Sequence, residues 1–100
     1  MNKPLADDNQ QNESSLVLFL AGDAPRSRRA HRNLSAALAA TCPDLAPVHE
    51  IDLLREPQQA IDFGIFATPA LLHIDAEGNR RLLYGDLSDE GRLTDFISVL

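Results

Sequence analysis

The chain has 100 residues, a net charge of −6 and a single cysteine, Cys42. This length allows one modest hydrophobic core but not two, and one cysteine excludes a disulfide-stapled secreted domain. The acidic balance argues against nucleic acid as a partner. Because no apolar stretch approaches the roughly 20 residues of a membrane span, no membrane contact is expected either.

The first fourteen residues differ in character from the rest of the chain. Residues 1–14 are polar and lack periodicity, which predicts a disordered tail. They contain no apolar segment of the kind found in signal peptides, so we expect a cytoplasmic protein. Residues 15–100 carry eight basic and twelve acidic side chains and are predicted to form a single domain.

A strand–helix–strand unit is predicted in the first half of the chain. Ser15–Ala21 is a continuous apolar run, typical of a strand buried on both faces. The turn Gly22–Pro25 ends this run, and Asp23 is the expected N-cap of a helix that stops before Pro43. Residues 47–54 predict a second strand, which the intervening helix places parallel to the first.

The second half predicts a helix, a hairpin and a closing helix. The first of these helices begins at Glu56 and is ended by Gly64. Strands over residues 70–74 and 80–84 flank a turn rich in turn-forming residues. Ser88 is the expected N-cap of the closing helix. Apolar residues at helical spacing form one face of that helix: Leu93, Phe96, Ile97 and Leu100.

The predicted order, βαβαββα, corresponds to an α/β fold in which a mixed four-stranded sheet carries helices on both faces, the thioredoxin-like arrangement. A thioredoxin carries two cysteines in the turn that follows the strand predicted here over Ser15–Ala21. In this chain that turn, Gly22–Ser27, contains no sulfur. Thr68-Pro69 occupies the place of the cis-proline opposite that turn and is predicted to be cis. A redox scaffold without redox chemistry predicts a protein that acts by binding.

Four stretches of the chain, taken together and in this order, resemble the KaiB family of circadian clock proteins. They are Leu20–Pro25 with Ser27, Arg29 and Ala30; Ile51–Gln58; Ala67–Leu71; and Gly85–Asp89. The sequence is also similar to the thioredoxin-like sensory domain of the clock-associated histidine kinase SasA.

The resemblance implies a regulator without catalytic activity or cofactor. KaiB proteins bind the ring-shaped ATPase KaiC, and the SasA domain competes for the same site, so a KaiC-type ATPase and a competing histidine kinase are the implied partners. KaiB proteins also switch fold, between a thioredoxin-like monomer and a tetramer whose C-terminal half is folded otherwise. A fold-switched ground state and a homo-oligomer, dimer or tetramer, are therefore alternatives. The implied hinge is Gly85, Asp86, Leu87, Ser88 and Asp89.

Four of the nine basic residues lie within seven positions at the start of the first helix. Helix starts favour acidic residues, so this cluster opposes the helix dipole by roughly a few tenths of a kcal/mol per charge. Arginine pairs with carboxylates through two parallel hydrogen bonds and often anchors interfaces. A surface that docks an acidic partner is predicted, with a solvated helix face as the alternative. The predicted partner-binding set is Pro25, Arg26, Arg28, Arg29, Arg32, Thr68, Pro69, Gly85 and Asp86.

Two other functions remain open from the residues alone. One is a redox-inactive thioredoxin-like adaptor in stress response or signalling, without a clock role. The other is a monothiol oxidoreductase using Cys42, which is disfavoured because the C-terminal end of a helix destabilises a thiolate. His31, His49 and His73 lack metal-ligand spacing, and no glycine-rich phosphate loop is present, so no metal or cofactor site is expected.

Overall fold

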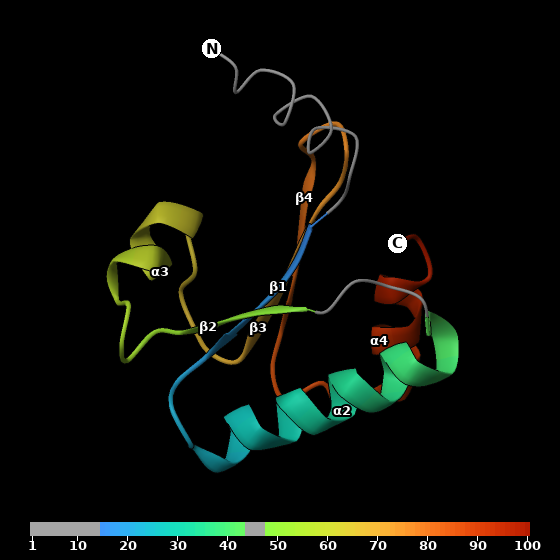
Figure 1. The fold of residues 1–100 in the computed structure, drawn as a ribbon, viewed down its shortest axis with the longest axis horizontal. Coiled ribbons are helices and arrows are strands. Elements are labelled where there is room, and N and C mark those ends of the chain that lie inside the picture. Colours follow the sequence, from blue (N-terminus) through green and yellow to red (C-terminus); the bar gives the residue numbers. More distant parts are fainter. Residues whose placement is uncertain (1–14, 44–47) are drawn as a thin grey trace.

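The computed structural model describes residues 15–43 and 48–100, and its elements follow the predicted order (Figure 1). The predicted tail, residues 1–14, and Pro47 at the start of the second predicted strand lie outside the described residues. The elements are β1 (Ser15–Leu20), α2 (Pro25–Thr41), β2 (His49–Asp52), α3 (Gln58–Phe63), β3 (Ala70–Ile74), β4 (Arg80–Tyr84) and α4 (Glu90–Ile97).

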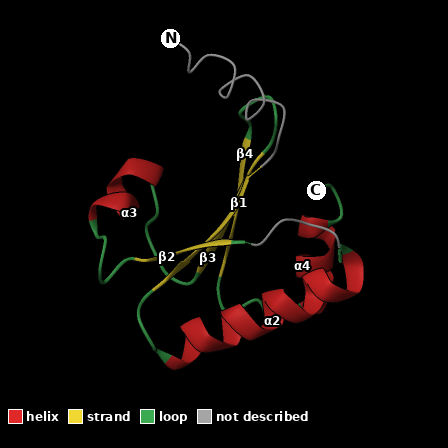
Figure 2. Ribbon diagram, in the orientation of Figure 1, coloured by secondary structure: helices red, strands yellow, loops and turns green. Residues whose placement is uncertain are grey.

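The four strands form one mixed sheet in the order β2-β1-β3-β4. β2 runs parallel to β1, whereas β1 with β3 and β3 with β4 pair antiparallel. Figure 2 shows this sheet between two layers of helix, with α2 and α4 on one side and α3 on the other. The thioredoxin-like arrangement predicted from the sequence is confirmed.

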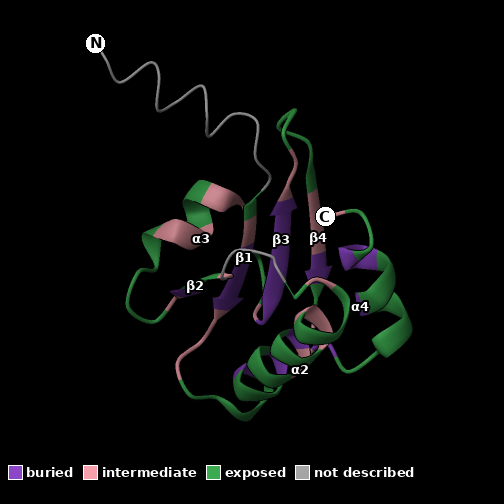
Figure 3. Ribbon diagram, turned by 45° about the vertical axis from the view of Figure 1, so that its right-hand side comes forward, coloured by how far each residue is buried: buried purple, intermediate pink, exposed green. Residues whose placement is uncertain are grey.

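Each face of the sheet buries its own hydrophobic cluster, because successive side chains of a strand point to opposite faces. Leu18 and Leu71 pack beneath α2 and α4, whereas Phe19 and Leu72 belong to the cluster beneath α3. These four side chains are completely buried, and burying each one contributes about 1.5–3 kcal/mol. Figure 3 shows the buried central strands and the exposed outer surfaces of the helices.

Two predicted helix caps are wrong. The N-cap of α2 is Ala24, not Asp23, and no side chain caps that helix. The N-cap of α4 is Asp89, whose carboxylate accepts a hydrogen bond from the Arg92 N–H at 3.1 Å. Ser88 does not cap α4, because it lies two residues before the helix, where its own N–H donates to the Asp86 carboxylate at 3.1 Å.

The second strand is shorter than predicted, since β2 ends at Asp52 rather than Leu54. The Asp52 Oδ1 atom accepts hydrogen bonds from the N–H groups of Gly22, at 2.9 Å, and Leu54, at 3.0 Å. The second bond turns the chain away from the strand direction, and the first fixes the turn that leads into α2. A side-chain acceptor therefore ends this strand, which hydrophobicity alone does not reveal.

Candidate protein-docking face

The four arginines of the predicted site occupy the first two turns of α2, and all are exposed. A helix advances by about 100° per residue, so they divide between two flanks of the buried helix face. Arg26 and Arg29 lie on the flank beside the Gly85–Asp89 segment, which we term the loop flank. Arg28 and Arg32 lie on the flank beside β1 and β2, which we term the strand flank. The buried face between them consists of Ser27, Ala30 and Leu34.

The loop flank ties α2 to the Gly85–Asp89 segment. The Arg29 Nε donates to the Asp86 Oδ2 at 2.9 Å, and the Asn33 side-chain amide donates to the Asp86 carbonyl at 2.9 Å. A Cβ built at Gly85 would lie 3.8 Å from the Arg26 guanidinium. Two predicted elements of the site, the helix start and the Gly85–Asp89 segment, are therefore in direct contact.

Asp86 is the charged centre of this contact. Hydrogen bonding from the Ser88 side chain and from Arg29 lowers the pKa of Asp86 to about 2. Both donors favour the ionised carboxylate, and Ser88 has the larger effect. Asp86 is therefore ionised throughout the physiological pH range, and its ion pair with Arg29 persists there.

The third predicted element, Thr68-Pro69, joins the same face through its backbone. The peptide bond is cis, as predicted, and the Pro69 carbonyl accepts a hydrogen bond from the Gly85 N–H at 2.9 Å. Pro69 itself is fully buried, whereas Thr68 is partly exposed. A partner that reaches this loop would touch Thr68 and the residues before it rather than the proline ring.

The Gly85–Asp89 segment has unusual backbone geometry. Gly85 has φ of 113°, which a residue with a side chain rarely adopts. Leu87 has φ of 62°, and among residues 15–43 and 48–100 no other non-glycine residue has positive φ. This conformation costs roughly 1–2 kcal/mol, and the burial of the Leu87 side chain in the α2–α4 cluster offsets that cost.

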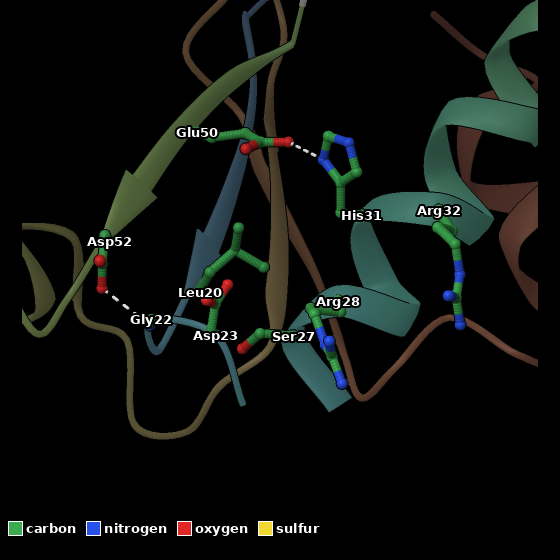
Figure 4. A pocket seen from close by; sticks show the side chains of 9 residues that line it. All are labelled: Leu20, Gly22, Asp23, Ser27, Arg28, His31, Arg32, Glu50 and Asp52. Carbon is green, nitrogen blue, oxygen red and sulfur yellow. Dashed lines mark hydrogen bonds and ion pairs between the residues drawn. The ribbon is translucent and has the colours of Figure 1, made fainter. Parts of the chain in front are cut away.

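The strand flank opens onto a hollow of about 430 Å³ between α2 and the ends of β1 and β2. In Figure 4 the His31 ring meets the Glu50 carboxylate, while Arg28 and Arg32 extend away from it. Neither of these two arginines forms an ion pair with a described residue. Among residues 15–43 and 48–100 the guanidinium groups of the strand flank therefore have no carboxylate partner, unlike that of Arg29.

Sequence reasoning missed Phe66. Its side chain is 91% exposed, and it lies two residues before Thr68, within about 7 Å along the chain. An exposed phenylalanine is the type of side chain that anchors many protein interfaces. The signal available in the sequence was a phenylalanine placed between the stop signal Gly64 and the Ala67–Pro69 motif, where no regular element can bury it.

The structure places Cys42 far from this face. It is the C-cap of α2, sixteen residues and therefore about 24 Å along the helix from Arg26. In the described part of the chain, no group of three or more His, Cys, Asp or Glu side chains is arranged to hold a metal ion. No helix within residues 15–43 and 48–100 has the length and apolarity needed to cross a membrane.

Comparison with known proteins relates the chain to one protein family. A family model of the KaiB domain matches residues 17–98. Proteins named circadian clock oscillator protein KaiB from a Synechococcus species and from Acaryochloris marina are 38% and 37% identical over 85 residues. The match covers 85% of this chain and 76% and 81% of those proteins.

Among solved structures, the similarity is to thioredoxins. Fasciola hepatica thioredoxin superposes with a TM-score of 0.72 at 20% identity, covering 97% of this chain and 88% of that one. The protein named Trxlp from Edwardsiella tarda gives a TM-score of 0.75 at 15% identity, covering 97% and 93%. At these identities the comparison shows a shared fold and nothing about chemistry.

Proposed function

The chain belongs to the KaiB family, and from that premise we propose that it is a non-catalytic clock regulator that binds a KaiC-type ATPase and modulates its phosphorylation or ATPase cycle. Binding would occur through the docking face formed by the first turns of α2, the Phe66–Thr68 loop and the Gly85–Asp89 segment. A histidine kinase with a similar sensory domain would compete with this chain for the same site on the ATPase.

The observation that supports this proposal best is the availability of Arg28 and Arg32 in a chain of net charge −6. The helix start has no side-chain cap and no acidic residue in its first turn, so its unpaired N–H groups add to the positive potential of the arginines. An acidic surface on the ATPase would supply carboxylates to these two arginines, which form no ion pair with the Asp23, Glu50 or Asp52 side chains that line the same hollow.

Phe66 would contribute the apolar part of the interface. A side chain that is 91% exposed loses contact with water when a partner covers it, and large aromatic anchors dominate the binding energy of many interfaces. Its position beside Thr68 places it next to the loop that is hydrogen-bonded to Gly85. Apolar burial would therefore supply affinity, and the arginines would supply orientation.

The thioredoxin-like conformation would be the one that binds, and partner binding would increase its population. The Gly85–Asp89 segment is the proposed hinge of the switch to the alternative fold, because Leu87 holds a backbone conformation that is favourable only while its side chain is buried. If that side chain left the α2–α4 cluster, its burial would no longer offset the cost of the positive φ at Leu87.

The proposal is tested by titrating the purified chain against the KaiC-type ATPase of the same organism and measuring both Kd and ATP hydrolysis. We expect saturable binding and a changed hydrolysis rate. Phe66→Ala should weaken binding about tenfold or more. Val99→Ala is the matched control, because Val99 is also an exposed apolar residue, at 61%, but lies at the C-terminal end of the chain.

Absence of binding by the wild-type chain would overturn the proposal. Equal weakening by Phe66→Ala and Val99→Ala would reject the docking face while leaving the function intact. Capture of an unrelated signalling protein from the native host, with no ATPase bound, would favour the adaptor function instead.

A further inference from the structure

A second cluster, which includes none of the docking-face residues, surrounds the imidazole of His73. This residue lies on β3, on the sheet face that α2 and α4 cover, and is only 4% exposed. In the sheet register, His73 pairs with Leu16 of β1 and with Arg81 of β4. Phe96 of α4 meets the imidazole edge to face, with ring centroids 6.5 Å apart. Three elements therefore enclose one titratable side chain.

Arg81 connects His73 to α4. Its Nη2 atom lies 2.6 Å from the Phe96 carbonyl oxygen and 3.3 Å from the His73 Nδ1. Its guanidinium also stacks on the Phe96 ring, 4.3 Å from the centroid. The arginine thus holds the last turn of α4 against the sheet, and one of its hydrogen bonds ends on the imidazole.

The contact with Arg81 favours the neutral form of the His73 ring. An arginine can only donate, so the Nδ1 must accept and carry no proton. The proton of the neutral ring is then on the Nε2, which is buried and has no hydrogen-bond partner among the described residues. Protonation would place an N–H on the Nδ1. This N–H would face the Arg81 guanidinium, which has no acceptor to offer.

The charged groups that act on the imidazole are Arg81 from β4 and Asp75 at the end of β3. β1 contributes Leu16 and α4 contributes the Phe96 ring and carbonyl, none of which titrates. Burial, followed by the charge of Arg81, lowers the pKa of His73 below its ordinary value of 6.5, and Asp75 only partly opposes this. The Asp75 carboxylate is itself occupied by the backbone N–H groups of Glu77 and Asn79.

We propose that His73, Arg81 and Phe96 form an acid-sensitive latch that holds α4 on the sheet and opens when His73 is protonated. Protonation removes the acceptor for Arg81 and sets two cations against each other in a buried site. The sign follows from linkage: a histidine whose pKa is lowered by folding stabilises the protein above pH 6.5, and this contribution is lost as the pH falls.

The test is to follow urea unfolding and amide protection of α4 between pH 7.5 and 5.5, together with the NMR titration of the His73 ring. In the wild type the unfolding equilibrium constant should rise by up to about tenfold for each pH unit below 6.5. His73→Leu should abolish this rise. His49→Gln is the matched control, because His49 is exposed on β2, and it should retain the rise.

Arg81→Gln sharpens the test, because it keeps a donor but removes the charge, and it should move the ring titration of His73 upward. If His73→Leu fails to fold, His73→Gln and the ring titration of the wild-type chain decide the question. A His73 ring that titrates at or above pH 6.5 would overturn the latch. So would a loss of folding stability at low pH that is the same in either His73 variant as in the wild type.

Discussion

The two flanks of α2 carry the same residue type in the same two turns, yet their arginines have different surroundings. On the loop flank, Arg29 is paired with Asp86, and Asn33 holds the backbone of the same residue. On the strand flank, Arg28 and Arg32 border an open hollow and pair with no described residue. In the proposed docking face, one flank would thus fix the shape and the other would supply the charge.

The two flanks would therefore have different roles: the loop flank stabilises the proposed docking face, and the strand flank binds the partner. Changes on the loop flank should alter folding first and binding only as a consequence. Changes on the strand flank should alter binding and leave folding unaffected, since exposed arginines that form no ion pair contribute little to stability.

The largest effect is expected at Leu87, which holds the segment that the loop flank contacts. Leu87→Ala should destabilise the fold by about 3 kcal/mol, because it removes a buried side chain. Leu87→Gly should be more stable than Leu87→Ala by about 1 kcal/mol, the reverse of the usual order, because glycine tolerates positive φ. Urea unfolding of both variants measures this difference. The usual order, with alanine the more stable, would show that the backbone is not strained.

Reversing the charge of the strand flank should have the next largest effect, this time on binding. Arg28→Glu with Arg32→Glu should weaken binding to the ATPase about a hundredfold, equivalent to about 2.7 kcal/mol. The urea midpoint should stay within error of the wild type. The control compares Arg28→Glu alone with Arg80→Glu, because each changes the net charge by the same amount and Arg80 is exposed at the end of β4 opposite Tyr84, which directly precedes Gly85. The Arg80 guanidinium donates to the Phe63 carbonyl, so the urea midpoint of this variant is measured as well. Equal losses from both changes would assign the effect to net charge alone.

Asp86 should give the loop flank a pH dependence at the acid end. Because folding lowers the pKa of Asp86 from 3.8 to about 2, its contribution to stability is present above pH 3.8 and is lost as the pH falls through 2. Thermal unfolding at pH 6 and pH 2 should show a larger loss for the wild type than for Asp86→Asn. Ser88→Ala and Arg29→Gln should each raise the pKa of Asp86, because both side chains donate to its carboxylate. If the wild type and Asp86→Asn lose the same stability between pH 6 and pH 2, Asp86 is not the source of this pH dependence.

The smallest effect is expected at Cys42, which lies at the opposite end of α2 from both flanks. Cys42→Ala should leave the binding affinity unchanged within a factor of about two, since the residue is remote from the docking face. Insulin-reduction and glutathione-dependent assays should detect no activity in either form. Activity in the wild type that disappears in Cys42→Ala would support the alternative function, a monothiol oxidoreductase.

Much of the fold could be predicted from the sequence because local signals decided it. Continuous apolar runs marked β1 and β3, and Gly64 ended α3 in the left-handed conformation that helix stops favour. The helix caps were less predictable, since aspartate and serine side chains competed for nearby N–H groups. Ser88 is bound to Asp86, so the next residue, Asp89, became the cap.

The site was predictable in composition but not in arrangement. Helical spacing places Arg28 and Arg29 on different flanks, but only the fold shows which flank meets Asp86, a residue 57 positions from Arg29. The exposure of Phe66 likewise depends on how α3 and β3 are joined in space. The burial of Pro69, whose carbonyl is bound to Gly85, has the same origin.

The most direct test of the docking face is the amide hydrogen-exchange footprint of this chain in complex with the KaiC-type ATPase. Protection on binding should appear in the first two turns of α2, in residues 66–68 and in residues 85–89, with α3 and the turn at residues 75–79 unchanged. Protection confined to α3 and that turn, with the first turns of α2 still exchanging freely, would contradict the account.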